Sequence, residues 1–103
     1  MIRHIVFFSA KDQKDRARVE EGLQMLGDTP HASFFEIGRN INHDAISEQV
    51  DFVVYGEFDD EAALAAYKAD PLYQRSIDIV RPLRELRIAA DFVSSPGSGK
   101  TKD

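Results

Sequence analysis

Four side chains in this sequence combine residue types that can move protons or donate hydrogen bonds: His4, Asp91, Tyr67 and Tyr73. His4 lies in an apolar segment at the start of the chain, and Asp91 lies in another near its end. An aspartate that hydrogen-bonds to an imidazole fixes its tautomer and raises its basicity, so this pair is a candidate acid/base group. The alternative is a structural hydrogen bond between two strand ends, without chemistry.

Alternating side chains predict the strands that would bring this pair together. In residues 2–9, His4 shares a face with Val6 and Phe8, and in residues 86–93 Asp91 lies opposite the apolar face. If the first and last strands are antiparallel neighbours, the start of one meets the end of the other. We therefore expect Asp91 to lie beside His4, on the side of the sheet that the helices cover.

The two tyrosines lie in predicted helices. Their hydroxyls are expected to point into a pocket lined by Phe8, Val54 and Leu64. Two phenols and an imidazole around an apolar cavity suit a phenolic or polyketide-like ligand. The alternative is that Tyr67 and Tyr73 are aromatic residues of the core or its rim, with solvated hydroxyls.

The stretch from Asp51 to Tyr73 shows how these residues are positioned. It contains an alternating strand, the acidic helix start Asp59-Asp60-Glu61, an alanine-rich helix, and Asp70-Pro71, which should end one helix and cap the next. The full chain predicts strands at 2–9, 32–41, 50–58 and 86–93, and helices from Asp12 or Asp15 to 26, at 62–69 and at 71–81. This β-α-β-β-α-β order predicts an α+β, ferredoxin-like fold with a four-stranded antiparallel sheet.

The strands carry apolar residues on both faces, although helices in this fold cover only one. The residues that the helices cannot all cover are Ile5, Phe7, Val53, Tyr55 and either Phe34 or Phe35. An uncovered apolar sheet face is usually an interface. We therefore predict a homodimer in which two sheets pack face to face, a dimeric α+β barrel.

The chain resembles the stress-responsive A/B barrel (Dabb) family over residues 3–92. The resemblance rests on five features taken in order: His4-Ile5-Val6-Phe7-Phe8, residues 35–41, residues 51–58, Ala66-Tyr67 leading to Pro71, and Asp91-Phe92. It implies a dimeric barrel with a pocket between sheet and helices in each subunit. On this basis residues 1–93 form the domain, and residues 94–103 form a polar, disordered tail.

The best understood enzyme of this family is a plant polyketide cyclase, with a tyrosine followed by His-Pro-x-His. Here Tyr67 and Pro71 match, but Asp70 and Tyr73 stand at the two histidines. The second histidine is the general base that the resemblance implies for the cyclase. A phenol with its usual pKa of about 10 does not readily accept a proton near neutrality, so Tyr73 does not replace that base.

Composition narrows the partners. The chain has 103 residues, no cysteine and a net charge of −5. Its remaining histidines, His31 and His43, are scattered, so we expect no metal and no cofactor. RNA recognition motifs share this element order, but Asp51 and Glu57 flank the aromatic residues of the third strand, and we expect no nucleic acid partner. The apolar run at 5–8 is too short for a membrane span or a signal peptide, which predicts a cytoplasmic protein.

Two functions stay open at this stage. One is a small dimeric barrel that binds a hydrophobic or phenolic molecule; its physiological role is undefined, and a stress response is one candidate. The other is a cofactor-independent, polyketide-cyclase-like or other acid/base enzyme that uses His4 and Asp91, with Tyr67 as a further catalytic candidate.

Overall fold

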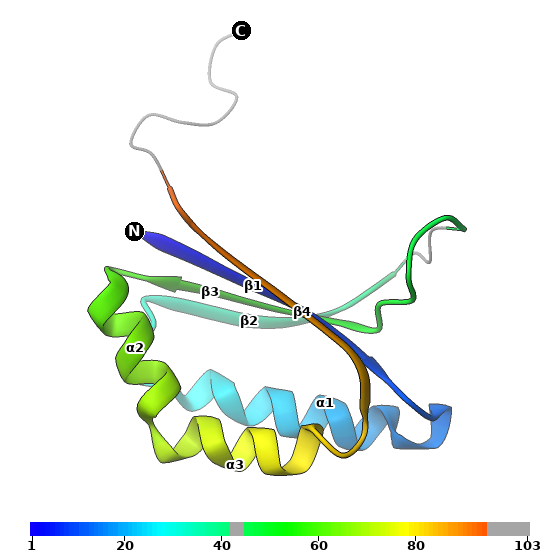
Figure 1. The fold of residues 1–103 in the computed structure, drawn as a ribbon. Helices are drawn as coiled ribbons and strands as arrows, with labels where there is room; N and C mark the ends of the chain where they lie inside the picture. Colours follow the sequence, from blue (N-terminus) through cyan, green and yellow to red (C-terminus); the bar gives the residue numbers. More distant parts are fainter. Residues whose placement is uncertain (42–44, 95–103) are drawn as a thin grey trace, which may run out of the picture.

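The computed structural model describes residues 1–41 and 45–94 as one sheet covered by helices on one side (Figure 1). The sheet has the order β2-β3-β1-β4, and all its pairs are antiparallel. The elements are β1 (Ile2–Ala10), α1 (Arg16–Gln24), β2 (Phe34–Arg39), β3 (Phe52–Phe58), α2 (Glu61–Ala69), α3 (Pro71–Val80) and β4 (Arg84–Val93), with short 3-10 turns η1 (Gln13–Asp15) and η2 (Met25–Asp28) on either side of α1. The predicted α+β, ferredoxin-like arrangement is confirmed.

The element boundaries follow the predicted caps with small shifts. Asp70 ends α2 and caps α3, where its carboxylate accepts a hydrogen bond from the backbone N–H of Leu72 at 2.9 Å. Asp60 caps α2 in the same way through the N–H of Ala63. The second strand is shorter than predicted, and β4 begins two residues earlier than predicted, at Arg84. His43 and the predicted tail from residue 95 onward lie outside the described residues.

Alternation along β1 and β3 divides the sheet into two faces. Toward the helices, β1 presents Ile2, His4, Val6 and Phe8, and β3 presents Phe52, Val54, Gly56 and Phe58; all of these are buried. The buried positions of α1, α2 and α3 complete this core. The helix-facing side of the sheet is therefore the hydrophobic core of the chain.

A close contact between α1 and α3 forms the floor of this core. A Cβ atom at Gly22 would lie 2.7 Å from a methyl carbon of Val80, so only glycine allows the helices to approach this closely. The Ser76 hydroxyl, buried between the helices, donates to the Gly22 carbonyl at 2.7 Å. These two contacts fix α3 relative to α1, and α3 carries Tyr73.

The other face of the sheet carries no helix among the described residues (Figure 1). Its large apolar side chains are exposed: Phe7 by 37%, Phe34 by 46%, Phe92 by 50% and Ile88 by 51%. Of the two neighbouring phenylalanines, Phe34 is the one on this open face, while Phe35 packs against Tyr67 in the core. We call this surface the open sheet face.

No helix in the described part of the chain is long and apolar enough to cross a bilayer.

Candidate functional site

The strand register brings His4 and Asp91 together. They are directly paired in the β1–β4 ladder, and the Nδ1 atom of His4 lies 2.5 Å from a carboxylate oxygen of Asp91. The second carboxylate oxygen lies 4.0 Å from the Lys68 ammonium on α2. An ionised carboxylate can only accept hydrogen bonds, so the Nδ1 atom of His4 must be the donor and carry the proton. The Nε2 atom is then free of a proton and can accept a hydrogen bond.

His4 is enclosed by aromatic rings and is only 1% exposed. The edge of its ring meets Phe58 at a centroid distance of 6.2 Å and Tyr67 at 5.9 Å. Gly56 is its partner in β3, where a Cβ would lie 2.9 Å from the Phe58 ring. Burial lowers the pKa of His4 below 6.5, against the opposing effect of the Asp91 hydrogen bond. The imidazole is therefore neutral near pH 7 and able to accept a proton.

Tyr67 lies beside His4 and contacts Tyr73 at a centroid distance of 5.0 Å. Burial, followed by the neighbouring Tyr73, raises the pKa of the Tyr67 hydroxyl well above its usual value. The Tyr67 hydroxyl consequently stays protonated at neutral pH. It can donate a hydrogen bond to a ligand, and it does not act as a base.

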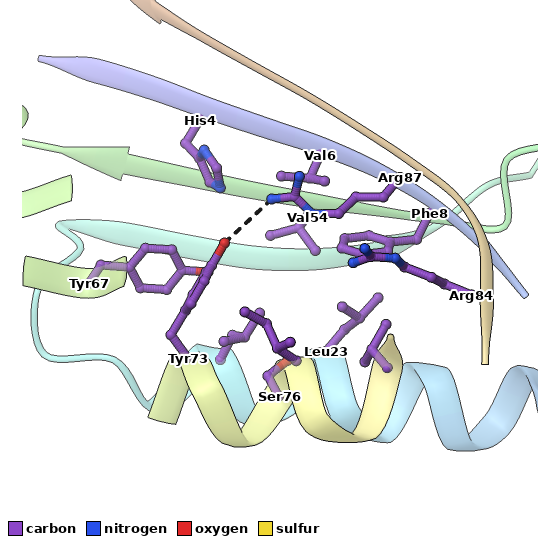
Figure 2. Close-up of a pocket in the computed structure, with 13 residues that line it drawn as sticks. His4, Val6, Phe8, Leu23, Val54, Tyr67, Tyr73, Ser76, Arg84 and Arg87 are labelled. Carbon is purple, nitrogen blue, oxygen red and sulfur yellow. Dashed lines mark hydrogen bonds between the residues drawn. The ribbon is translucent and has the colours of Figure 1, made fainter. Parts of the chain in front are cut away.

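A cavity of about 30 Å³ lies between the sheet and the helix layer (Figure 2). Its walls come from β1, α1, η2, β3, α2, α3 and β4, and its lining residues are His4, Val6, Phe8, Leu23, Leu26, Val54, Tyr67, Tyr73, Ser76, Ile77, Val80, Arg84 and Arg87. A cavity of this size holds roughly two water molecules. The lining is apolar except where His4, the tyrosines, Ser76 and the arginines enter it.

Most of the predicted site residues meet at this cavity. His4, Tyr67, Tyr73, Phe8 and Val54 line it. Asp91 is not part of the lining; it lies behind the imidazole and acts on the cavity only through His4. Leu64 does not line the cavity either. It is half-buried and packs against the core, because the helix-facing place beside the cavity on α2 is taken by Tyr67.

Two arginines at the cavity were missed from sequence. Arg87 donates to the Tyr73 hydroxyl at 3.4 Å, a long and therefore weak hydrogen bond, shown dashed in Figure 2. The signal for Arg87 was present, since it shares the predicted face of Asp91. Arg84 gave no such signal. It is three positions before Arg87, and in a regular strand residues three positions apart lie on opposite faces.

A second histidine–aspartate pair lies outside this cavity. The Nε2 atom of His31 is 3.2 Å from Asp70, whose other oxygen caps α3. The backbone N–H of Leu72, followed by His31, lowers the pKa of Asp70. The carboxylate of Asp70 thus serves as the N-cap of α3. Within residues 1–41 and 45–94, no group of three histidine, aspartate or glutamate side chains is arranged to hold a metal ion.

The family model of the Stress responsive A/B Barrel Domain (Dabb) matches residues 2–94. The chain therefore belongs to the Dabb family, which confirms the resemblance seen in the sequence. No curated protein matches the chain.

Solved structures with this fold support the assignment. A dimeric ferredoxin-like protein of unknown function from Thermobifida fusca is 26% identical, with a TM-score of 0.75 and 90% of each chain covered. A Dabb family protein with a ferredoxin-like fold from Mesorhizobium loti is 25% identical, with a TM-score of 0.75, covering 92% of this chain and 97% of that one. A protein from Arabidopsis thaliana shares the fold at 17% identity, with a TM-score of 0.78, covering 95% of this chain and 99% of that one.

Proposed function

We propose that this protein is a homodimer that binds a small hydrophobic or phenolic molecule between the sheet and the helices of each subunit. The observation that carries the proposal is the convergence of His4, Tyr67 and Tyr73 on one cavity with many apolar lining residues. Binding sites for small molecules commonly combine apolar walls with a few polar groups that fix orientation. The imidazole Nε2 accepts a hydrogen bond from a phenol, and the Tyr67 hydroxyl donates one to a ligand oxygen.

The open sheet face supports the dimer. Four of its large apolar side chains are between 37% and 51% exposed, and an apolar sheet face of this kind usually forms an interface with another chain. The similar protein from Thermobifida fusca is dimeric. In the proposed dimer the two open sheet faces cover each other and the helices lie outside, so each subunit keeps its own cavity.

Ligand entry requires the cavity to enlarge. Its volume of about 30 Å³ is too small for an aromatic ring. Arg87 is exposed and Tyr73 is half-buried, and the hydrogen bond that joins their side chains is weak. These two side chains are therefore the proposed entrance.

A thermal-shift screen of phenols and apolar compounds tests the binding function. A ligand at 100 times its dissociation constant stabilises the folded state by about 2.7 kcal/mol. For a phenolic hit we expect Tyr67→Phe to weaken binding several-fold, because one hydrogen bond is lost, while the matched variant Tyr55→Phe on the open sheet face binds as the wild type does. Equal losses in both variants, or no hit in the screen, would contradict the proposed pocket.

The second candidate function is acid/base catalysis without a cofactor, of the polyketide-cyclase-like or a related kind. The contact of 2.5 Å between His4 and Asp91 supports it, because the aspartate orients the imidazole and stabilises its protonated form. In this reaction Nε2 of His4 removes a proton from the carbon next to a carbonyl group. The Tyr67 hydroxyl donates to the resulting enolate oxygen, and His4 returns the proton to carbon.

Deuterium exchange measures this chemistry without knowledge of the natural substrate. Phenylacetone in deuterated buffer is the probe, and NMR follows the loss of its protons next to the carbonyl. The acid/base function predicts faster exchange with the wild type, little with His4→Gln and an intermediate rate with Asp91→Asn. His31→Gln, which disrupts the other histidine–aspartate pair, serves as control. Exchange that is as fast with His4→Gln as with the wild type argues for binding alone.

A further inference from the structure

A bulge in β4 turns Arg84 toward the cavity, on the same side of the sheet as Arg87. Ala10 pairs with Arg84 and Ser9 pairs with Leu86, so one extra residue, Glu85, is inserted in β4 at the edge of the sheet. Directly paired residues share a face, and Arg87 pairs with Phe8, two positions before Ala10. The insertion therefore places Arg84 and Arg87 on the helix-facing side, although they are three residues apart.

Arg84 and Arg87 both line the cavity. Figure 2 shows the two side chains extending from β4 toward the lining residues. Among the described residues neither forms an ion pair with a carboxylate, and the one hydrogen bond of Arg87 goes to a neutral phenol at 3.4 Å. Burial, and then the positive charges of Arg87 and Arg81, lower the pKa of Arg84. In a chain with a net charge of −5, this is a locally cationic wall.

We propose that the ligand of this cavity is a hydrophobic acid whose carboxylate binds to Arg84 and Arg87 while its apolar part enters between His4, Phe8 and Val54. This inference rests on the proposed binding function and specifies its ligand class. Guanidinium groups match the planar geometry of a carboxylate and form the stronger, charge-assisted hydrogen bonds. The carboxylate takes the place of the Tyr73 hydroxyl beside Arg87, which opens the proposed entrance.

Matched pairs of acids and amides test the charge requirement. We would titrate the full chain, followed by ¹H–¹⁵N NMR, with benzoate and benzamide, 3-phenylpropionate and its amide, and hexanoate and hexanamide. The members of each pair have nearly the same shape and differ in charge. We expect at least one carboxylate to bind about tenfold or more tightly than its amide, with the advantage falling as salt is added.

Single substitutions locate the effect. Arg84→Gln and Arg87→Gln should each weaken binding of that carboxylate about tenfold, while affinity for the amide stays within about twofold. Arg81→Gln is the matched control, because it removes the same charge from an exposed residue that does not line the cavity. The melting temperature of each variant without ligand establishes that it is folded.

The outcomes separate this inference from the binding function. If an amide binds as tightly as its acid, with shifts at cavity residues, the pocket stands and the anionic ligand class is wrong. If Arg81→Gln weakens the carboxylate as much as Arg84→Gln and Arg87→Gln do, the effect is general electrostatics and the assignment to these two residues is wrong. If no acid or amide of the panel binds while neutral phenols do, the anionic ligand class is wrong and the binding function stands. If neither the panel nor the phenols bind, the proposed binding function is wrong as well.

Discussion

The two faces of the same sheet have opposite surroundings although both carry large apolar side chains. Phe58 on β3 faces the helices and is fully buried, whereas Phe34 on the neighbouring strand faces outward and is 46% exposed. The difference comes from the topology, because α1, α2 and α3 all lie on one side of the sheet (Figure 1). One face is complete within the chain, and the other is completed by a second copy in the proposed dimer.

This comparison separates the two parts of the proposed function. The helix-facing side holds the cavity, the neutral imidazole and the arginines, so ligand chemistry belongs to the single subunit. The open sheet face holds the exposed apolar residues and also polar side chains, among them Tyr55, which donates to Glu57 at 2.6 Å. Assembly should therefore be disrupted without loss of the cavity, and the cavity altered without loss of assembly.

The largest expected effect contrasts two phenylalanines. Phe58→Ala should lower the free energy of unfolding by about 3–5 kcal/mol, because it leaves a cavity in the core. Phe34→Ala should lower it by much less in dilute protein, and its cost should grow at concentrations where the dimer forms. Urea denaturation at two protein concentrations measures both. Equal losses for the two variants in dilute protein would mean that the faces are not distinct.

The next effect concerns assembly. Ile88→Glu places a charge on the open sheet face and should raise the dimer dissociation constant by about 100-fold or more, since a carboxylate cannot be buried unpaired against apolar side chains. Sedimentation equilibrium measures the constant, and circular dichroism shows that the fold remains. Ile41→Glu is the control, because Ile41 is exposed outside the sheet. A wild-type chain that stays monomeric at high micromolar concentration rules out the proposed interface.

The smallest effect is a dependence of stability on pH. Because the folded chain lowers the pKa of His4 below 6.5, protonation favours the unfolded state. The stabilisation from the neutral imidazole is complete above about pH 6.5 and declines as the pH falls toward the folded-state value, by at most about 1.4 kcal/mol per pH unit for one proton.

Comparing His4→Gln with the wild type isolates this pH dependence from that of other groups. In the wild type the imidazole of His4 faces Asp91, Lys68 and Arg87, and its pKa is lowered. Acidification from pH 7 to pH 5 should therefore destabilise the wild type more than His4→Gln, and the difference between their free energies of unfolding should narrow. The same comparison with His31→Gln controls for removal of a histidine. A difference that stays constant over this range would show that His4 titrates alike in both states.

Much of the site could be predicted because it depends on alternation and strand order. His4 and Asp91 are 87 positions apart, yet the face that each occupies and the order of the strands were enough to pair them. Arg84 could not be found this way, because a bulge changes which face a residue occupies and no residue type in this stretch marks one. Leu64 does not line the cavity for a different reason. On a short helix the periodicity allows either Leu64 or Tyr67 to face inward, and the choice depends on packing against the sheet, where Tyr67 contacts His4 and Phe58.

The sequence by itself determined the element order, the acidic start of α2 within residues 59–61, the cap at Asp70, and the excess of apolar residues on the sheet, because these depend on local periodicity and capping. It also determined the family. The tertiary structure alone decided that Phe34 and not Phe35 lies on the open sheet face, that the cavity is narrow, and that two arginines enter it. These features depend on the register of strands far apart in sequence and on close packing between helices, neither of which is a property of any single segment.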